Sequence, residues 1–424
     1  MKIAFVVTHF PAISETFVMN QITGLLERGH EVDIYADRPR KESRVPADVG
    51  KFRLLEKTHY APRLPGDPLS RTAQALALAA RHWRSAPRQV AGALNVFRFG
   101  KLAGSFKLLH SAVPFLARRP AYDIIHAHFG LNGIKAQALR DIGAVSGKLV
   151  TTFHGYDVTV RAPGAGRNRY ARLFERGELF TSNSRYTAER AHELGCPAER
   201  LMQLAMGVDI RAFVPKQRRT TRAGGPALLT VARLVEVKGV EYALRAVALL
   251  VPRHPELKYR VIGDGPLRAS LEKLCRELRI EANVEFWGGR PQEELFAAYE
   301  QADLFVLPSV AAADGGVETQ GVALIEAQAM GLPVVASRVG GIPDSLADGV
   351  SGALVPERNP EALARKLSEL LEHRELWPEM GRAGQRFVKE KFDSCKLNDR
   401  LEELYRQVLR GEFKPTDQSA IAAS

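Results

Sequence analysis

Two glutamates in one glycine-rich segment offer the clearest chemistry in this sequence. Glu318 and Glu326 stand eight positions apart in DGGVETQGVALIEAQAM, residues 314–330. Glu318 precedes a predicted helix, whereas Glu326 lies about one turn inside it, among apolar residues where a charge is costly without partners. Carboxylates accept hydrogen bonds from sugar hydroxyl groups. The pair therefore predicts a polar ligand site, although two glutamates near one helix are more often simply solvated charges.

The start of this helix is suited to an anion. The first backbone N–H groups of a helix have no partner within it, and the helix dipole places partial positive charge there. A glycine at this point permits close approach of a phosphate. The residues that lead into the helix are Thr319, Gln320, Gly321 and Val322. We therefore expect a phosphate-bearing ligand with a glutamate on either side.

A second pair of chemically useful residues is basic. Arg233 follows a predicted strand and Lys238 opens the next helix, so both belong to the carboxyl end of that strand. Together these cations can neutralise a diphosphate leaving group. The chain contains no D-x-D motif that would offer a metal ion for the same task. Taken alone, however, two cations in an ordinary surface loop would look the same.

The N-terminal half offers a histidine at the end of another predicted strand. His154 lies in TTFHGYDV with Asp157 close behind it, so both would face the opening beyond the sheet. A lone histidine is more often structural, and Asp157 is the weaker candidate of the two. Near the N-terminus, Glu15 and Thr16 open a helix and can face a second substrate, whereas Ser14 fits the N-cap position of that helix.

Hydrophobic patterning supplies the scaffold that these residues need. Apolar runs alternate with helical patterns over about residues 2–184 and again over 227–337. Such alternation is typical of parallel β-α-β units, and runs as apolar as IAFVV need cover on both faces. Residues 207–226, rich in Gly, Pro, Arg and Thr, resemble an exposed linker. Ligands bind outside the carboxyl ends of strands in doubly wound sheets, so two facing domains of this class form a deep cleft.

The chain of 424 residues is long enough for two domains. We expect an N-terminal domain over 1–207 and a C-terminal domain over 208–384. A helix over 385–413 would pack back on the N-terminal domain, and 414–424 would form a flexible tail. Three separated cysteines without a C-x-x-C pair favour a reducing compartment. The short apolar start excludes a signal peptide, and no run of 18 apolar residues occurs, so we expect a cytoplasmic location.

Residues 71–120 carry most of the net charge of +12. They contain nine Arg and Lys, no Asp or Glu, and five large aromatic residues. This mixture suits an anionic membrane surface, whereas ordinary helices with a solvated basic face would have the same composition. No nucleic-acid-binding motif accompanies it. The residues concerned are Arg71, Arg81, Arg84, Arg88, Arg98, Lys101, Lys107, Arg118 and Arg119, with Trp83, Phe97, Phe99, Phe106 and Phe115.

These motifs together resemble the retaining family 4 glycosyltransferases of the GT-B fold. The two glutamates match the E-x-seven-E signature of that family. VARLVEVKGVEYALRA, VIGDGPLRASLE, LPSV, VALIEAQAMGLPVVAS and GGIPD follow in family order over 227–357. SETFVMNQI, TTFHGYDV and DGGVETQGVALIEA are similar to exopolysaccharide glycosyltransferases of the colanic acid and amylovoran type. The resemblance covers nearly the whole chain and implies an α/β fold with two doubly wound, Rossmann-like domains.

The resemblance also implies roles for individual residues. Glu318 would contact the hydroxyls of the donor sugar, and Glu326 the ribose of the nucleotide. Arg233 and Lys238 would neutralise the diphosphate, and His154 would reach the sugar near the reacting centre. Many relatives have two glycines where this chain has Ala12, Ile13 and Ser14, so a phosphate contact there does not carry over. Further donor-side residues would be Gln320, Gly321, Val322, Gly263, Asp264, Arg290 and Gly341.

From these observations we expect a metal-independent, retaining hexosyltransferase without a cofactor. Its donor would be a nucleotide-diphosphate sugar, with UDP-sugars favoured over GDP-mannose. Its acceptor would be a glycan or lipid-linked oligosaccharide of exopolysaccharide or cell-surface glycan biosynthesis, at the inner face of the cytoplasmic membrane. One alternative is a catalytically silent GT-B scaffold that binds a nucleotide sugar or a partner enzyme. Another is a nicotinamide-dependent oxidoreductase, which lacks support because no G-x-G-x-x-G follows the first strand.

Overall fold

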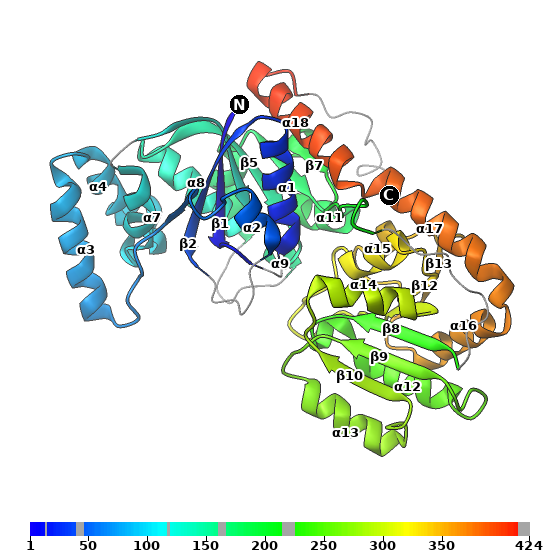
Figure 1. The fold of residues 1–424 in the computed structure, drawn as a ribbon. Helices are drawn as coiled ribbons and strands as arrows, with labels where there is room; N and C mark the ends of the chain where they lie inside the picture. The colour runs from blue at the N-terminus through cyan, green and yellow to red at the C-terminus, as the bar shows by residue number, and fades with distance from the viewer. Residues whose placement is uncertain (13–14, 40–45, 117–118, 160–166, 214–224, 414–424) are drawn as a thin grey trace.

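The computed structural model describes residues 1–12, 15–39, 46–116, 119–159, 167–213 and 225–413. Within these ranges the chain forms two domains, each built around a parallel β-sheet with helices on both faces (Figure 1). The predicted α/β class and the two Rossmann-like domains are confirmed. Ser14, most of the predicted linker and the predicted tail 414–424 lie outside the described ranges.

The N-terminal sheet has seven strands in the order β3-β2-β1-β4-β5-β6-β7, and every pairing is parallel. The strand order reverses between β1 and β4, and ligands of such sheets bind at the carboxyl end of that switch point. The strands are β1 (Lys2–His9), β2 (Glu31–Arg38), β3 (Thr58–Tyr60), β4 (Ala121–His128), β5 (Ser146–Phe153), β6 (Leu179–Ser182) and β7 (Leu201–Gln203).

The C-terminal sheet has six strands in the order β10-β9-β8-β11-β12-β13, again all parallel. Its switch point lies between β8 and β11, so the loops after these two strands define its ligand edge. The strands are β8 (Ala227–Val231), β9 (Lys258–Ile262), β10 (Val284–Gly288), β11 (Leu304–Leu307), β12 (Val334–Ser337) and β13 (Gly352–Val355).

Helices cover both faces of each sheet. In the N-terminal domain they are α1 (Thr16–Glu27), α2 (Ala47–Lys51), α3 (Pro68–Trp83), α4 (Pro87–Ala93), α5 (Val96–Phe99), α6 (Lys101–Gly104), α7 (Lys107–Leu116), α8 (Gly130–Asp141), α9 (Tyr156–Thr159), α10 (Ala171–Arg176) and α11 (Arg185–Glu193). The remaining helices are α12 (Val240–Leu250), α13 (Arg268–Leu278), α14 (Gln292–Gln301), α15 (Val322–Ala329), α16 (Pro360–Glu372), α17 (Trp377–Lys391) and α18 (Ser394–Arg410). None of these helices is both long and apolar enough to cross a bilayer.

The first strand shows why so apolar a run must be covered on both faces. Ile3 and Phe5 belong to a buried cluster shared with α1 and α18, whereas Ala4 and Val6 face a second cluster shared with α7 and α8. All four residues are at most 2% exposed. Because successive side chains of a strand point to opposite faces, one short sequence joins two hydrophobic cores.

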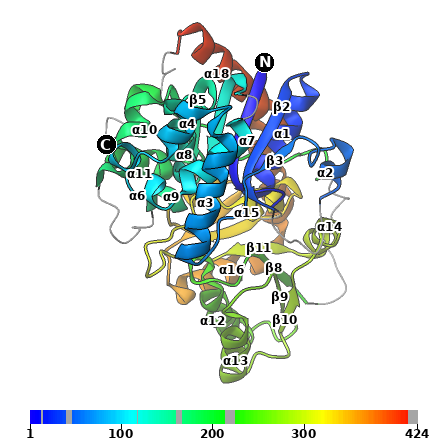
Figure 2. The same ribbon diagram turned by 90° about the vertical axis from the view of Figure 1, so that its left-hand side faces the viewer.

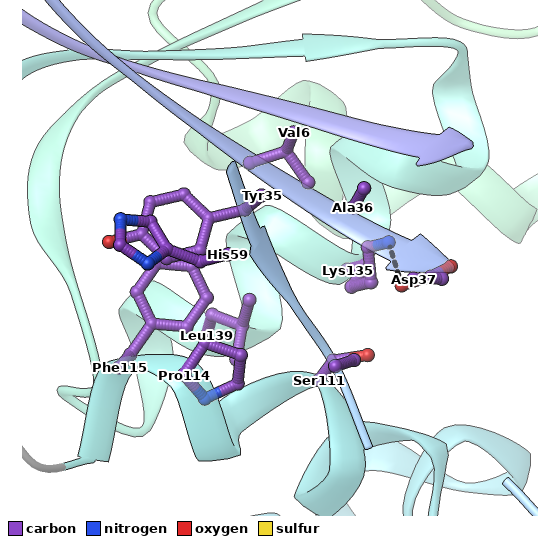
Figure 3. A pocket seen from close by; sticks show the side chains of 11 residues that line it. Val6, Tyr35, Ala36, Asp37, His59, Ser111, Pro114, Phe115, Lys135 and Leu139 are labelled. Atoms are coloured by element: carbon purple, nitrogen blue, oxygen red, sulfur yellow. Dashed lines mark hydrogen bonds and ion pairs between the residues drawn. The ribbon is translucent and has the colours of Figure 1, made fainter. Parts of the chain in front are cut away.

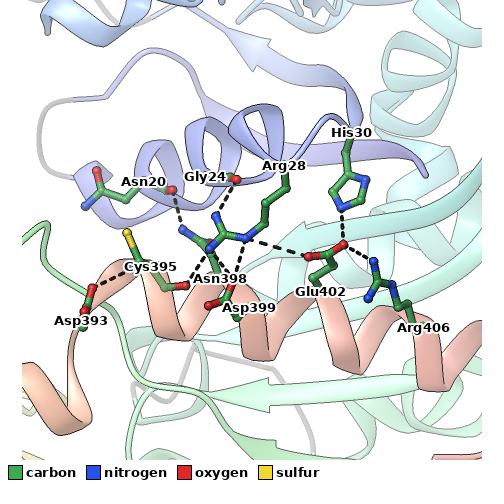
Figure 4. Close-up of polar contacts among 10 residues, drawn as sticks. All are labelled: Asn20, Gly24, Arg28, His30, Asp393, Cys395, Asn398, Asp399, Glu402 and Arg406. Atoms are coloured by element: carbon green, nitrogen blue, oxygen red, sulfur yellow. Dashed lines mark hydrogen bonds and ion pairs between the residues drawn. The ribbon is translucent and has the colours of Figure 1, made fainter.

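The chain returns to the N-terminal domain through α18 (Figure 4). The two crossings between the domains pair with each other, since Val208 N–H donates to the Phe392 carbonyl at 2.9 Å and Ser394 N–H donates to the Val208 carbonyl at 3.0 Å. Helix α17, which ends at Lys391, packs on α15 of the C-terminal domain. The return to the N-terminal domain therefore begins at Asp393, and not at residue 385 as expected from the sequence.

Helix α18 is held on α1 by polar contacts at the surface and apolar contacts beneath. The Arg28 guanidinium donates to Asp399 at 2.6 Å and to the carbonyls of Gly24 and Cys395 at 2.8 Å. Leu401 and Leu404 of α18 are at most 1% exposed within the N-terminal core. Helix α18, the last helix of the described residues, therefore forms part of the N-terminal domain.

The basic stretch 71–120 lies mainly within the helical insertion α3–α7 between β3 and β4. In Figures 1 and 2 this insertion lies on the outer side of the N-terminal domain, with α3 at its edge. Its aromatic residues divide between two environments. Phe115 is buried in the core, whereas Trp83 is 52% exposed and Phe97 is fully exposed.

Candidate active site

A cleft of about 1210 Å³ opens between the two domains. On one side it is lined by α1, residues 46–52 and the crossing at 207–213, and on the other by the starts of α14 and α15. Five of the residues predicted from the sequence line it: Thr16, Asp264, Arg290, Val322 and Glu326. The structure thus brings predicted residues from both domains to one opening.

Glu326 lies in α15 and lines this cleft, with the Tyr299 hydroxyl as its one side-chain partner among the described residues. The Tyr299 hydroxyl donates to Glu326 Oε2 at 2.9 Å. Burial raises the pKa of Glu326 to about 7, and the hydrogen bond from Tyr299 only partly opposes this rise. A carboxylate that titrates near neutral pH and keeps free acceptor capacity is suited to bind hydroxyl groups of a ligand.

Glu318 and Lys238 form an ion pair in the loops after β8 and β11. Their side chains are only 12% and 19% exposed, respectively. The loop that carries Glu318 is fixed from behind, because Gly341 N–H donates to the Glu318 carbonyl at 2.9 Å. Arg233, in the same β8 loop, is exposed and has no side-chain partner among the described residues. The two predicted cations therefore differ: Lys238 is paired with Glu318 before any ligand binds, whereas Arg233 is exposed to solvent.

The helix α15 begins as predicted, at Val322, with Gly321 as its N-cap. The glycine is needed for packing, since a Cβ atom there would lie 2.8 Å from Leu307 and 2.9 Å from Ile342. The side chain of Gln320 turns away from the donor side. Its Oε1 accepts from Met206 N–H at 2.9 Å, and its Nε2 donates to the Met206 carbonyl at 2.7 Å. Each amide atom of Gln320 thus makes one hydrogen bond at the domain crossing, and the donor contact of this residue stays a prediction.

The other predicted donor-side residues shape neighbouring loops. Gly263 has φ +135°, and a Cβ atom there would lie 1.9 Å from the Ala232 carbonyl oxygen. Asp264 accepts from Gly289 N–H at 2.6 Å, and Arg290 donates to Glu294 at 3.0 Å. Asp264 and Arg290 line the cleft, whereas Gly263 and Gly341 allow backbone segments to touch.

On the N-terminal side, His154 follows β5 and is buried rather than exposed at the lip of the sheet. Its Nε2 lies 2.9 Å from Nδ1 of His128, and its Nδ1 has no partner in the described chain. Burial, and next the neighbouring His128, lower the pKa of His154 well below its ordinary value, so the ring is neutral. The ring of Phe17, which lines the cleft, lies 4.5 Å from that of His154.

Asp157 has a structural position, not the substrate-facing one predicted. Its Oδ1 accepts from the N–H groups of His154 and Gly155 at 3.1 and 3.0 Å, and its Oδ2 accepts from Gly130 N–H at 2.8 Å. Burial raises the pKa of Asp157, and these backbone hydrogen bonds oppose the rise. The carboxylate therefore fixes the loop that carries His154.

The start of α1 also differs from prediction. Its N-cap residue is Glu15, one position after Ser14, and the cap makes no side-chain hydrogen bond to the helix. Thr16 lines the cleft as the first residue of the helix. Of the predicted acceptor-side residues, Thr16 is thus the one that the structure places at the cleft.

A direct contact between the domains joins the two halves of the site, and the sequence did not reveal it. Thr319 Oγ1 donates to the His154 carbonyl at 2.8 Å, and Asn183 Nδ2 donates to Thr319 Oγ1 at 3.1 Å. Gly155 makes room for this contact, because a Cβ atom there would lie 2.1 Å from Cγ2 of Thr319. The loop of Glu318 and the loop of His154 are therefore bonded to each other.

A second, much smaller pocket lies at the outer edge of the N-terminal sheet (Figure 3). Lys135 of α8 donates to Asp37 at the end of β2 at 2.6 Å. Burial lowers the pKa of Lys135, and the carboxylate of Asp37 opposes that change. The pocket holds about 10 Å³, which is the space of a single water molecule. The pocket is therefore too small for a substrate, and the partly buried ion pair beside it joins α8 to the end of β2. None of the predicted site residues lines this pocket.

Across the described part of the chain, no three His, Cys, Asp or Glu side chains are grouped as ligands of a metal ion.

Comparison with known proteins identifies both halves of the chain. The family model for Glycosyltransferase Family 4 matches residues 14–212, and that for Glycosyl transferases group 1 matches residues 215–387. The putative colanic acid biosynthesis glycosyltransferase WcaL of Salmonella typhimurium is 35% identical over 96% of this chain and all of its own. The amylovoran biosynthesis glycosyltransferase AmsK of Erwinia amylovora is 38% identical over 87% of this chain and 90% of its own.

Among solved structures, Anabaena HepE in complex with UDP and glucose superposes with a TM-score of 0.69. The match covers 96% of this chain and 100% of that structure at 18% identity. At this level of identity the likeness establishes the fold, which agrees with the two facing sheets and the cleft between them.

Proposed function

Because the chain belongs to glycosyltransferase family 4 and has the GT-B fold, we propose that it is a retaining hexosyltransferase of exopolysaccharide or cell-surface glycan biosynthesis. Its donor is a nucleotide-diphosphate sugar, and its acceptor is a glycan, in our proposal a lipid-linked oligosaccharide. Relatives named for colanic acid and amylovoran biosynthesis, which match most of the chain, support this assignment.

The observation that carries the proposal is the ion pair of Lys238 and Glu318. A diphosphate carries more negative charge than a carboxylate, so it competes for the Lys238 ammonium when it enters. The Glu318 carboxylate is then free to accept hydrogen bonds from the sugar hydroxyls next to the diphosphate. Arg233, which is open to solvent, adds a second cation to the leaving group.

Glu326 completes donor binding on the same side of the cleft. A carboxylate can accept a hydrogen bond from each hydroxyl of a ribose, and the Tyr299 hydroxyl occupies only one of its oxygens. We favour a uridine nucleotide, in line with the UDP held by HepE, and keep GDP-mannose as the alternative donor.

Transfer then requires a bond to form and a bond to break on one face of the sugar. The acceptor hydroxyl oxygen attacks the anomeric carbon as the bond to the diphosphate breaks. The departing phosphate oxygen takes the hydroxyl proton, so configuration is retained and no protein base is required. Lys238 and Arg233 supply the positive charge that makes a metal ion unnecessary in this scheme. Approach of the two domains excludes water, which favours transfer over hydrolysis.

A thermal-shift panel tests the donor site. Wild type and Glu326→Ala are titrated with UDP-sugars and GDP-sugars, and ligand binding raises the melting temperature by mass action. We expect a shift with one nucleotide class that disappears in Glu326→Ala and persists in Glu277→Ala, a control on the exposed face of α13. The absence of any shift in wild type would argue against the donor site and favour a silent scaffold that binds a partner enzyme.

The anomeric outcome is measured separately. Wild-type enzyme with donor and acceptor should release a glycoside with the anomeric configuration of the donor sugar, as read by NMR coupling constants. Slow donor hydrolysis without acceptor would also separate an enzyme from a silent scaffold. A product of inverted configuration would refute the retaining scheme while leaving the donor site intact.

We further propose that the helical insertion rests on an anionic membrane, where a lipid-linked acceptor is found. On α3, Leu69, Leu76 and Trp83 recur every seven residues and are 84%, 66% and 52% exposed. This spacing places the three side chains on one face of the helix. Exposed basic residues follow the last of these side chains along the sequence, Arg84 at the end of α3 and Arg88 in α4. An apolar stripe flanked by cations fits an anionic bilayer surface.

Vesicle sedimentation tests this surface. We expect binding to vesicles that contain phosphatidylglycerol, weak binding to pure phosphatidylcholine, and loss of binding in Leu76→Glu. Leu249→Glu is the matched control, because Leu249 is 52% exposed on α12 of the other domain. Equal binding by both variants would refute the membrane role of α3.

A further inference from the structure

Helix α9 lies where the N-terminal domain meets the loop that carries Glu318 (Figure 1). Just before the helix, a Cβ atom on Gly155 would lie 2.1 Å from Cγ2 of Thr319. At the end of the helix, a Cβ atom on Gly315 would lie 3.4 Å from the Thr159 carbonyl oxygen. This four-residue helix therefore contacts the Glu318 loop at both of its ends.

The first side chain of α9 is a large one left in water. Tyr156 is 69% exposed, whereas the next two residues, Asp157 and Val158, are buried. Leu131, the second residue of α8, is 64% exposed. Gly130 N–H donates to Asp157 at 2.8 Å, so the segments that carry the two exposed side chains are bonded to each other. One exposed apolar side chain is ordinary, but two on adjoining segments beside a substrate site indicate a binding surface.

The backbone that carries Tyr156 is held firmly in place. Asp157 Oδ1 accepts from the N–H groups of His154 and Gly155 at 3.1 and 3.0 Å. The Asp157 carbonyl accepts from the buried Tyr170 hydroxyl at 2.7 Å. Since the segment is ordered before any ligand arrives, a ligand that packs on Tyr156 loses little free energy in fixing it.

The proposed reaction determines what must lie beside α9. The acceptor hydroxyl has to reach the anomeric carbon of a sugar held by Glu318, so the acceptor glycan must pass close to the loop of that residue. Helix α9 is the part of the N-terminal domain that contacts this loop at both ends. The C–H groups on one face of a hexose are apolar and can pack on an aromatic ring, while the phenol hydroxyl can bond to sugar hydroxyls.

We propose that Tyr156 and Leu131 form an acceptor platform, on which a hexose ring of the acceptor glycan stacks against the phenol ring. Tyr156 supplies most of the binding, and Leu131 extends the apolar surface. That the bound sugar belongs to the acceptor rests on the proposed function. Binding of a sugar to Tyr156, in contrast, can be measured without any nucleotide donor, so the two statements can fail separately.

Saturation-transfer NMR on the full chain without nucleotide tests the platform. The probes are maltose, cellobiose, lactose and α-1,3-mannobiose. We expect wild type to transfer saturation to the ring C–H protons of at least one disaccharide. For that probe, Tyr156→Leu should raise the Kd about fivefold to tenfold, because an apolar side chain without a ring cannot replace the aromatic contact.

Three further variants make the NMR result specific. Tyr156→Phe keeps the ring and should bind within about twofold of wild type, whereas Leu131→Ala should weaken binding about twofold to threefold. Leu249→Ala is the control for loss of an exposed apolar side chain, since Leu249 is 52% exposed on α12 of the other domain. Absence of any disaccharide signal in wild type, or equal binding by Tyr156→Leu, would overturn the proposal.

The thermal-shift panel with nucleotide sugars separates the platform from the donor site. Tyr156→Leu should keep the wild-type shift, because the ring contacts the acceptor and not the nucleotide. Loss of that shift in Tyr156→Leu would overturn the proposal, since the side chain would then serve the donor site or the fold. If no nucleotide sugar shifts wild type but a disaccharide binds through Tyr156, the donor assignment fails and the sugar platform stands.

Discussion

The two domains hold the chemistry of the predicted site in opposite ways, and of the groups compared here Glu326 and Phe17 line the cleft itself. On the C-terminal side the charged groups are paired in advance, with Lys238 on Glu318 and Tyr299 on Glu326. On the N-terminal side His154 is neutral, buried and enclosed by the rings of Phe17 and Phe129. A paired charge can exchange its protein partner for a charged ligand. The buried ring of His154, in contrast, can offer a ligand only one hydrogen bond, at a fixed position. We therefore expect ligand binding in the C-terminal domain to depend on charge and pH, and the contribution of the N-terminal domain to depend on the position of its side chains.

The largest expected effect comes from breaking the ion pair on the C-terminal side. Lys238→Met removes the cation that meets the diphosphate and leaves Glu318 as an unpaired charge. Loss of one contact to a developing negative charge costs about 10²–10³-fold in rate. Steady-state kinetics with a saturating acceptor should show this loss in kcat/KM for the donor.

Lys273→Met is the matched control for that experiment. Lys273 is 72% exposed on α13, where it pairs with Glu277 across one helical turn. Its removal should leave kcat/KM unchanged, because exposed pairs contribute little. If Lys238→Met lowers kcat/KM for the donor less than threefold, the ion pair of Lys238 and Glu318 does not contribute to donor binding as proposed.

A substitution at Gly155 should have the next largest effect, through geometry alone. Gly155 has φ +107°, and a Cβ atom there would lie 2.1 Å from Thr319 in the other domain. Gly155→Ala must therefore separate the loops that carry His154 and Glu318. A misplacement of about 1 Å can cost about 10²-fold, so we expect a loss of 10-fold to 100-fold in kcat.

Gly29→Ala is the control that separates the effect of backbone strain from the effect of the lost contact between the domains. Gly29 has φ +78°, but a Cβ atom there would meet nothing within 4 Å. It should lose about 1 kcal/mol of stability from backbone strain and keep full activity. Equal activities of the two alanine variants would remove the argument that domain contact at Gly155 positions the site.

A third experiment sharpens the contrast through pH. The pKa of Glu326 is about 7 in the folded protein, above its ordinary value of 4.5. As pH rises from 4.5 to 7, the unfolded chain releases this proton before the folded chain does, so the ionising carboxyl lowers stability. Glu326→Gln removes that cost, and the unliganded variant should gain about 1–3 kcal/mol at pH 8 and nothing at pH 4. Chemical denaturation at both pH values measures the difference.

The same variant should bind the donor nucleotide about tenfold more weakly at pH 8. Wild-type affinity should rise as pH increases from 6 to 8, because the ionised carboxylate accepts more hydrogen bonds than the acid. In Glu326→Gln the affinity should be flat with pH. A wild-type profile without slope in calorimetric titrations would mean that Glu326 does not meet the nucleotide.

The contrast between the two sides also explains what the sequence could predict. Glu318, Glu326 and the start of α15 lie within nine residues, so a motif on one loop and helix reveals them together. The pairing of Lys238 with Glu318 joins loops 80 positions apart, and no local pattern predicts it.

The N-terminal side was harder to predict because its parts come from separate strands. His128 lies 26 positions before His154, and Phe17 and Asn183 come from other elements. Asp157 has a residue type that can do chemistry, but its carboxylate accepts from two N–H groups of its own loop and from Gly130 N–H at the start of α8. This use of the carboxylate is visible only in three dimensions. The short edge strands β3, β7 and β13 were not predicted, since three or four residues show no periodicity.

The smallest expected effect tests whether the two sides are coupled by a single hydroxyl. Thr319→Val keeps the shape of the side chain but removes the hydrogen bond to the His154 carbonyl and the acceptor for Asn183. Thr230→Val is a matched control, because its buried hydroxyl donates to the Val306 carbonyl at 2.6 Å within the C-terminal domain. Each variant should lose about 1 kcal/mol of stability, but only Thr319→Val should also lower kcat, by about threefold to fivefold. If both variants lose stability equally and neither loses rate, the hydroxyl stabilises the closed arrangement without aligning the neutral histidine with the charged donor loop.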